Sequence, residues 1–157
     1  MDAYERFGRA LLRKAERMLG NHEDAGDVIQ TLFADLHQKT DAPMDLPYLY
    51  RAVTNRCLTF LRDEANRARL RDRHDGALAP AGRTSCDETA IGRDLLVKLV
   101  RDLDAHESEV LMYRYVDDMT QEEIAALLGL SRKTIGKRLD RIREAVRRLA
   151  GTGEGAP

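Results

Sequence analysis

Residues 120–149 read TQEEIAALLGLSRKTIGKRLDRIREAVRRL, a stretch that predicts two helices joined by a short turn. Thr120 can cap the first helix while Glu123 reaches back to the amide of the cap, which is the reciprocal pattern of a capping box. Gly129 suits the left-handed backbone position at which a helix ends, and Ser131 suits the cap of the next helix. The turn is therefore only about three residues long.

The space between these two helices calls for small and aliphatic side chains. Ala125 and Ala126 stand where the helices must approach closely. The residues expected to fill the gap are Ile124, Leu128, Leu130 and Ile135. A capped helix, a tight turn and a second helix with this filling are typical of a helix-turn-helix.

The second of these helices separates apolar from basic residues. Its apolar stripe recurs at helical spacing and comprises Ile135, Leu139, Ile142, Val146 and Leu149. Residues 131–149 also carry eight Arg and Lys against two acidic residues. A solvated amphipathic helix is the plain alternative, but the preceding capped helix and turn favour DNA. A major groove admits a helix, and guanidinium groups pair with phosphates or guanine edges.

Composition limits the fold class. The chain has 157 residues, of which 34% are charged and 5% aromatic, with no Trp, so its core must be aliphatic and thin. Helices with narrow apolar stripes fit this composition better than a sandwich or a barrel does. We therefore predict an all-α chain of one domain or two small ones.

The net charge of −1 conceals alternating acidic and basic segments. Residues 51–73 carry seven basic and three acidic side chains, and residues 131–157 carry eight and three. Residues 74–130 instead carry five basic and twelve acidic side chains. Two basic segments in acidic surroundings indicate two separate contacts with nucleic acid.

A helix predicted from Leu46 onward has two contrasting sides. Its apolar side comprises Leu46, Leu49, Val53, Cys57, Phe60 and Leu61. Its opposite, polar side comprises Tyr48, Arg51, Asn55, Thr59 and Arg62. A plain solvent face is one interpretation of the polar side. The mixture of Arg, Asn, Thr and Tyr favours phosphates and unstacked bases over an idle surface.

A change of composition at residues 76–92 predicts a linker between two helical domains, because its Gly, Pro and small residues bury little surface. We therefore expect a first domain over 1–75, a second over 93–150 and a disordered tail over 151–157. Two helices are expected before Leu46, with Tyr4 on the inward face of the first. Gly20 and Asn21 end the first helix and can cap the second. In the second domain we expect a capping box of Asp104 and Glu107, with Val110, Leu111 and Tyr115 pointing inward.

Other functional classes find little support. Cys57 and Cys86 lack metal-ligand spacing, and a reduced cytosol suits these thiols, although a single disulfide stays open. We expect no metal, no cofactor, no signal peptide and no membrane insertion. No phosphate-binding glycine loop, G-x-S-x-G or H-E-x-x-H motif indicates an enzyme.

Three segments in this order resemble the extracytoplasmic-function (ECF) group of bacterial RNA polymerase sigma factors, the minimal kind with regions 2 and 4. They are ERFGRALLRKAERMLGNHEDAGDVIQTLF, LPYLYRAVTNRCLTFLRD and LDAHESEVLMYRYVDDMTQEEIAALLGLSRKTIGKRLDRIREAVRRL. The D-x-x-Q-x-x-F and P-x-L-Y-R-x-x-x-N patterns carry most of this resemblance, because a helix-turn-helix alone is shared with many regulators.

The resemblance implies a cytoplasmic protein that binds core RNA polymerase and promoter DNA and is restrained by an anti-sigma factor until a signal arrives. Asp27, Gln30 and Phe33 match the polymerase-binding helix. The loop from Lys39 to Leu46 matches the segment that captures a flipped base of the minus-ten element. The residues implied in minus-ten binding are Tyr48, Arg51, Asn55, Thr59 and Arg62. Those implied in minus-thirty-five binding are Arg132, Lys133, Thr134, Lys137, Arg138 and Arg141.

The chain departs from the family pattern at five positions. Tyr48 and His37 stand where Trp is usual, and Thr59 stands where an L-D-x-x-R run has Asp. In the recognition helix Gly136 takes an often basic position, and Lys137 takes one often held by Ser. The resemblance therefore implies a sigma factor for a stress or signal-responsive regulon without indicating its promoter sequence.

Two other functions are compatible with parts of the sequence. A free-standing helix-turn-helix regulator, with an amino-terminal sensing or dimerisation domain, explains the second domain but not the polar side of the helix after Leu46. A protein-protein adaptor with incidental basic helices is the third possibility.

Overall fold

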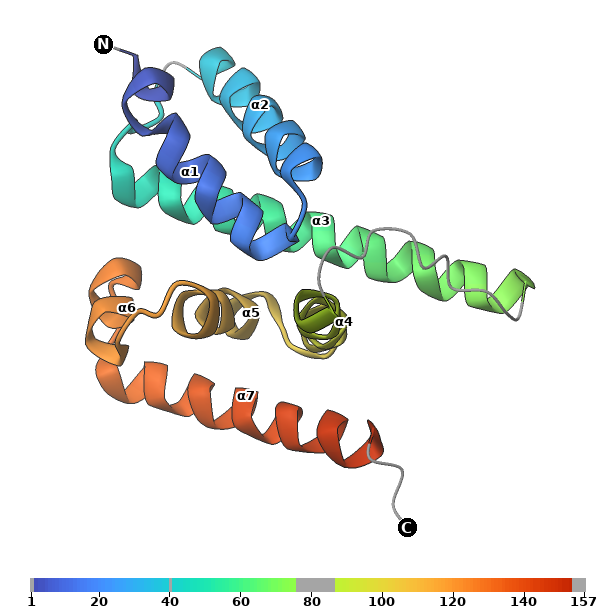
Figure 1. Cartoon of the computed structure of the whole chain (residues 1–157). Helices are drawn as coiled ribbons and strands as arrows, with labels where there is room; N and C mark the ends of the chain where they lie inside the picture. The colour runs from blue at the N-terminus through green and yellow to red at the C-terminus, as the bar shows by residue number, and fades with distance from the viewer. Residues whose placement is uncertain (1, 40, 76–86, 154–157) are drawn as a thin grey trace. The chain divides into compact units, whose positions relative to one another are not determined.

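The computed structural model describes residues 2–39, 41–75 and 87–153, and within these ranges the regular structure is entirely helical (Figure 1). Its elements are α1 Ala3–Leu19, α2 His22–Gln38, α3 Leu46–Asp75, α4 Asp87–Asp102, α5 Ala105–Leu111, η1 Met112–Val116, α6 Gln121–Leu128 and α7 Arg132–Gly153. The all-α prediction is confirmed. Contacts divide the chain into two units, Met1–Phe60 and Leu61–Pro157, with the boundary inside α3.

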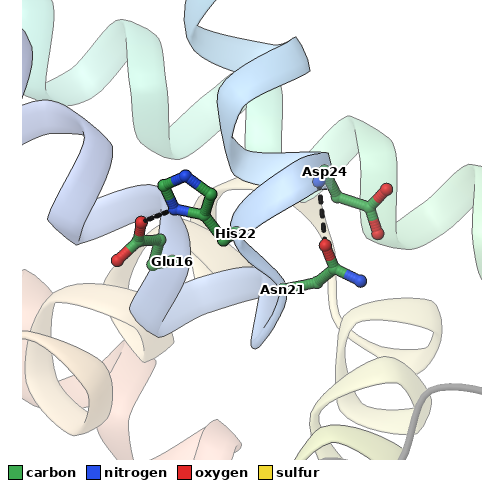
Figure 2. A network of polar contacts seen from close by, with 4 residues as sticks. All are labelled: Glu16, Asn21, His22 and Asp24. Atoms are coloured by element: carbon green, nitrogen blue, oxygen red, sulfur yellow. Dashed lines mark hydrogen bonds and ion pairs between the residues drawn. The ribbon is translucent and has the colours of Figure 1, made fainter.

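A tight turn joins α1 to α2, which run antiparallel in the first unit (Figure 1). Gly20 ends α1 in the left-handed conformation with φ 69°, and the side chain of Asn21 accepts a hydrogen bond of 3.0 Å from the Asp24 amide. The ring of His22 contacts the carboxylate of Glu16 across the turn (Figure 2). The sequence predicted both the glycine stop and the asparagine cap.

The core of the first unit is aliphatic, as the composition predicts. Its buried residues include Leu11, Met18, Leu19, Val28, Ile29, Leu32, Leu36, Leu49, Val53, Cys57 and Leu58. Two residues predicted to face inward are instead exposed, Tyr4 by 51% and Leu46 by 43%. Both lie in the first turn of their helix, and Tyr4 still contacts the Phe33 ring of α2. Periodicity shows the direction of a side chain but not how deeply that side chain is buried.

Lys14 is completely buried in this core, which periodicity did not predict. Its Nζ lies 4.1 Å from the centroid of the Tyr50 ring on α3. A buried ammonium needs compensation, and the negative face of an aromatic ring supplies part of it. The contact thereby links α1 to α3.

Helix α4 begins earlier than the sequence predicts for the first helix after the linker. Residues 87–92, expected in the linker, belong to α4, whereas 76–86 lie outside the described residues. At the other end, α7 extends to Gly153, and the rest of the expected tail lies outside the described residues.

A π-helical turn, η1, follows α5 and changes which tyrosine is buried. Asp104 and Glu107 form the predicted capping box, and Val110 and Leu111 are buried as expected. Tyr115 was predicted to point inward, but it is 54% exposed while Tyr113 is fully buried. The widened turn, with the amide of residue 117 bonded to the carbonyl of residue 112, rotates the following side chains out of the α-helical register.

The helix-turn-helix consists of α6, a turn and α7. Thr120 and Glu123 form both bonds of the predicted capping box, and Gly129 ends α6 with φ 66°. The Ser131 hydroxyl accepts a hydrogen bond of 3.1 Å from the Thr134 amide, as expected of a cap. The buried residues of the pair include Ile124, Ala125, Ile135, Leu139 and Ile142. Ala126 and Leu130 are exposed, contrary to prediction, so Ala125 alone of the two alanines is buried.

Gln121 fastens α6 to the start of α7. Its Nε2 donates a hydrogen bond of 2.7 Å to the carbonyl oxygen of Arg132. A Cβ at Gly136 would lie 3.0 Å from the same nitrogen, so a larger residue there would displace the amide. The glycine at this often basic position therefore leaves room for a contact that joins the two helices.

We expect Gly136→Ala to be less stabilising than Gly26→Ala. Both residues lie inside helices, where alanine is favoured over glycine by about 0.5–1 kcal/mol, but an added Cβ at Gly26 meets nothing within 4 Å. Displacement of Gln121 should offset the gain at Gly136 by about 1 kcal/mol. Urea denaturation of the full chain, followed by amide signals from each unit, measures the difference. Equal stabilisation by both substitutions would show that the Gln121 contact contributes nothing.

Candidate functional site

The residues implied in minus-thirty-five binding occupy three turns at the start of α7. Arg132, Lys133, Lys137 and Arg141 are exposed, and Thr134 and Arg138 are half-buried. The buried stripe of the helix holds its opposite side against the rest of the second unit. The structure therefore gathers five cationic side chains near the amino-terminal end of one helix that follows a tight turn.

Two contacts restrain members of this surface. A guanidinium nitrogen of Arg132 lies 3.3 Å from Glu122, and both side chains are mostly exposed. The hydroxyls of Ser131 and Thr134 lie 2.9 Å apart. An exposed ion pair contributes little to stability, so Arg132 can exchange its carboxylate for a phosphate at small cost.

The polar stripe of α3 is only partly gathered in one unit. Arg51, Asn55 and Thr59 are exposed and Tyr48 is half-buried, all within the first unit. Arg62 falls in the second unit, where its guanidinium donates a 3.2 Å hydrogen bond to the Ser108 hydroxyl. The first four of the predicted residues therefore form one surface, and Arg62 has a different environment.

A cavity of about 250 Å³ adjoins this surface in the first unit. Tyr48, Asn55 and Thr59 line it from α3, and Leu36 and Lys39 line it from the end of α2. The sequence predicted the three α3 residues but no cavity, because the apposition of two helices is not visible in the pattern of either one. A hollow with an aromatic ring, an amide and a hydroxyl offers stacking and hydrogen bonding to a planar polar group.

The loop after α2 is polar and mostly exposed. Lys39, Asp41, Pro43, Met44 and Asp45 are all exposed, whereas residue 40 lies outside the described residues. The Asp45 side chain accepts a 3.0 Å hydrogen bond from the Tyr48 amide, which anchors the end of this loop at the start of α3.

The three residues matched to polymerase binding differ in exposure. Asp27 and Gln30 are exposed on α2 and line a groove of about 570 Å³ between α1 and α2. Phe33 is half-buried, with its ring edge-on to Tyr4 at a centroid distance of 5.2 Å. Periodicity did not indicate Tyr4 as a member of this surface. The aromatic pair fixes the start of α1 beside the exposed face of α2.

Three carboxylates at helix starts of the second unit have shifted pKa values. The backbone hydrogen bond from Glu107 lowers the pKa of Asp104, whereas burial raises the pKa of Glu107 itself. The backbone hydrogen bond at Thr120 lowers the pKa of Glu123. These groups serve helix caps, which accounts for their shifts without a catalytic role.

Among the described residues, His, Cys, Asp and Glu nowhere gather in a group of three able to hold a metal ion. Over the same ranges no helix is sufficiently long and apolar to cross a bilayer. Cys57 is buried in the core, and Cys86 lies outside the described residues.

Comparison with known proteins matches both units. The family model of Sigma-70 region 2 matches residues 3–67, and that of Sigma-70, region 4, matches residues 93–146. Two proteins named RNA polymerase sigma-E factor, from Streptomyces avermitilis and Streptomyces coelicolor, are each 31% identical over 140 residues, which cover 86% of this chain and 78% of theirs. The solved structure of CnrH, in complex with the cytosolic domain of CnrY, has a TM-score of 0.54 and 28% identity, and the match covers 95% of this chain and 85% of that one.

The two family matches cover most of the described helices. The region 4 match contains α6 and the first two thirds of α7, and the region 2 match contains α1, α2 and most of α3. The identity to the Streptomyces relatives extends over most of the chain. The chain therefore belongs to the RNA polymerase sigma factors, in the extracytoplasmic-function group whose members have regions 2 and 4.

Proposed function

We propose that two surfaces of this sigma factor, the cationic start of α7 and the polar side of α3, divide promoter recognition between them. The main support comes from the amino-terminal half of α7. Its cationic residues are mostly exposed, and the helix follows a capped helix and a tight turn. Such a helix fits the major groove, where arginine pairs with guanine edges and with phosphates. In this proposal α7 reads the minus-thirty-five duplex through Arg132, Lys133, Thr134, Lys137, Arg138 and Arg141.

The minus-ten element is read as a separated strand by the first unit. Arg51 offers a cation, Asn55 an amide and Tyr48 an aromatic ring on one surface of α3, and the exposed loop after α2 adjoins it. Extruding a base costs a few kcal/mol, which pocket contacts and stacking offset. Arg62 is also proposed to contact the minus-ten element, although in this structure its guanidinium donates to the Ser108 hydroxyl of the second unit.

Core polymerase docks on the exposed part of α2. Asp27 and Gln30 supply a carboxylate and an amide at the mouth of the α1–α2 groove, and Phe33 adds an apolar edge. The nucleotide chemistry belongs to the polymerase, so this chain acts without a cofactor or a catalytic residue and works in the cytoplasm.

An anti-sigma protein restrains the sigma factor until a signal arrives. This part of the proposal rests on the solved relative CnrH, which is described in complex with the cytosolic domain of CnrY. The genes that this sigma factor transcribes then form a stress or signal-responsive regulon. A run-off transcription assay with core enzyme and genomic fragments tests the proposed activity, and absence of any specific transcript would contradict it.

Lys137→Ala and Arg138→Ala should each weaken promoter binding by the holoenzyme. If each residue contacts one phosphate of the duplex, its loss should reduce the slope of log affinity against log salt by about 0.9. Filter binding over a salt series measures the slope. Arg147→Ala, an exposed residue of the last turns of α7, is the matched control and should leave the slope unchanged. Unaltered affinity in both test variants would refute the recognition-helix assignment.

Asp27→Ala and Gln30→Ala should lower the affinity for core polymerase by about tenfold each, as expected when an interface residue contributes more than 1 kcal/mol. Competition with the wild-type chain for purified core enzyme provides the measurement. Thr31→Ala is a suitable control, because Thr31 is exposed on the same helix and its hydroxyl donates to the Asp27 carbonyl within that helix. A loss with Thr31→Ala as large as with Asp27→Ala would indicate a change in α2 itself.

A further inference from the structure

An ion pair lies in the lining of the cavity between α2 and α3. Asp35 of α2 contacts the guanidinium of Arg56 on α3, and both residues line the cavity together with Tyr48, Asn55 and Thr59. The side chains of Arg56 and Asp35 remain 37% and 46% exposed. The pair is therefore accessible to a ligand that enters the cavity.

Arg56 and Lys39 are the two cationic residues that line this cavity. A guanidinium on a long side chain can reach phosphates, and phosphate contacts add affinity for every strand regardless of its sequence. A guanidinium held by a carboxylate retains donors in a fixed plane but has less net attraction for phosphate. When Arg56 is free to contact phosphates, it raises the affinity for any strand. When Arg56 is paired with Asp35, its donors favour only a base that fits the cavity.

We propose that Asp35 is a specificity-determining residue, which holds Arg56 at the wall of the cavity and away from the strand backbone. The inference rests on the proposed reading of the minus-ten strand by the first unit. An exposed pair of this kind contributes little to stability, so its removal should alter binding more than folding. Asp35 thereby increases the selectivity of the cavity, because it lowers the affinity for strands whose bases do not fit there.

The test uses the holoenzyme and two single strands, one carrying the non-template minus-ten sequence of a promoter recovered by run-off transcription and one with that sequence scrambled. With Asp35→Asn and Asp35→Ala, affinity for the scrambled strand should rise. The ratio of matched to scrambled affinity should fall by about fivefold, equivalent to about 1 kcal/mol. The salt dependence on the scrambled strand should steepen by about 0.7, the value for one additional phosphate contact to a single strand.

Asp94→Asn is the matched control, because it removes the same charge from an exposed site on α4. Addition of Arg56→Ala to Asp35→Ala should restore the original salt slope, since the released cation is then absent. Circular dichroism checks that each variant is folded, and Arg56→Ala alone tests the same pair if the Asp35 variants do not fold. That variant should lose affinity for the matched strand but not for the scrambled one.

The inference is overturned if the Asp35 variants match Asp94→Asn in ratio and slope, or if the double variant keeps the steeper slope. Equal losses on both strands would also contradict it, because they indicate damage to the surface rather than release of Arg56. A different result would refute the proposed function. If the wild-type holoenzyme shows no preference for the matched strand, the first unit does not read the minus-ten element.

Discussion

Burial of one stripe of α7 determines where the basic residues of the second unit lie. Ile135, Leu139, Ile142 and Ala145 are buried at helical spacing, and α7 packs through contacts with α4, α5 and α6. A helix with one apolar stripe must present its remaining positions to solvent. The presentation of the cationic residues therefore follows from core packing, and a change in the core of this unit would turn the recognition surface as well as destabilise it.

The first unit follows the same principle with a different chemical outcome. Leu49, Val53 and Cys57 are buried on α3, whereas Arg51 and Asn55 lie on the exposed side. Here the exposed positions carry mixed polar groups rather than a nearly continuous series of cations. A duplex backbone is attracted by charge, whereas separated bases are recognised by hydrogen bonds and stacking, so the two surfaces suit different states of the DNA.

Features determined by neighbouring residues were predicted well from the sequence. Both capping boxes, the cap at Asn21 and the helix stops at Gly20 and Gly129 depend on side chains within a few positions of the backbone groups that they satisfy. The same information predicted the helix-turn-helix and the two faces of α3. The functional roles of the surface residues stay predictions, because exposure alone does not identify what they bind.

Features determined by distant residues were not predicted. The Tyr115 side chain is exposed at a π-helical turn that changes the register, and no local residue pattern predicted that turn. Asp35 and Arg56 are 21 positions apart, and Gln121 and Arg132 are 11 apart, so each pair meets only after two helices pack. In the sequence Lys14 resembles an ordinary surface cation, and only the structure shows that its Nζ lies over the Tyr50 ring. Each feature depends on tertiary packing, which periodicity within one helix does not contain.

Acidic side chains beside the α7 cations lower the attraction of this helix for DNA phosphates. Glu122 lies beside Arg132 and Asp140 beside Arg143, in pairs that are largely exposed. Pairs of this kind contribute at most about 1 kcal/mol to stability, so stability does not explain them well. Each carboxylate does lower the attraction of its cation for phosphate, which is the sequence-independent part of DNA affinity. If this surface binds DNA as proposed, its affinity for the backbone alone is weakened, and contacts at the bases then contribute a larger share of the discrimination.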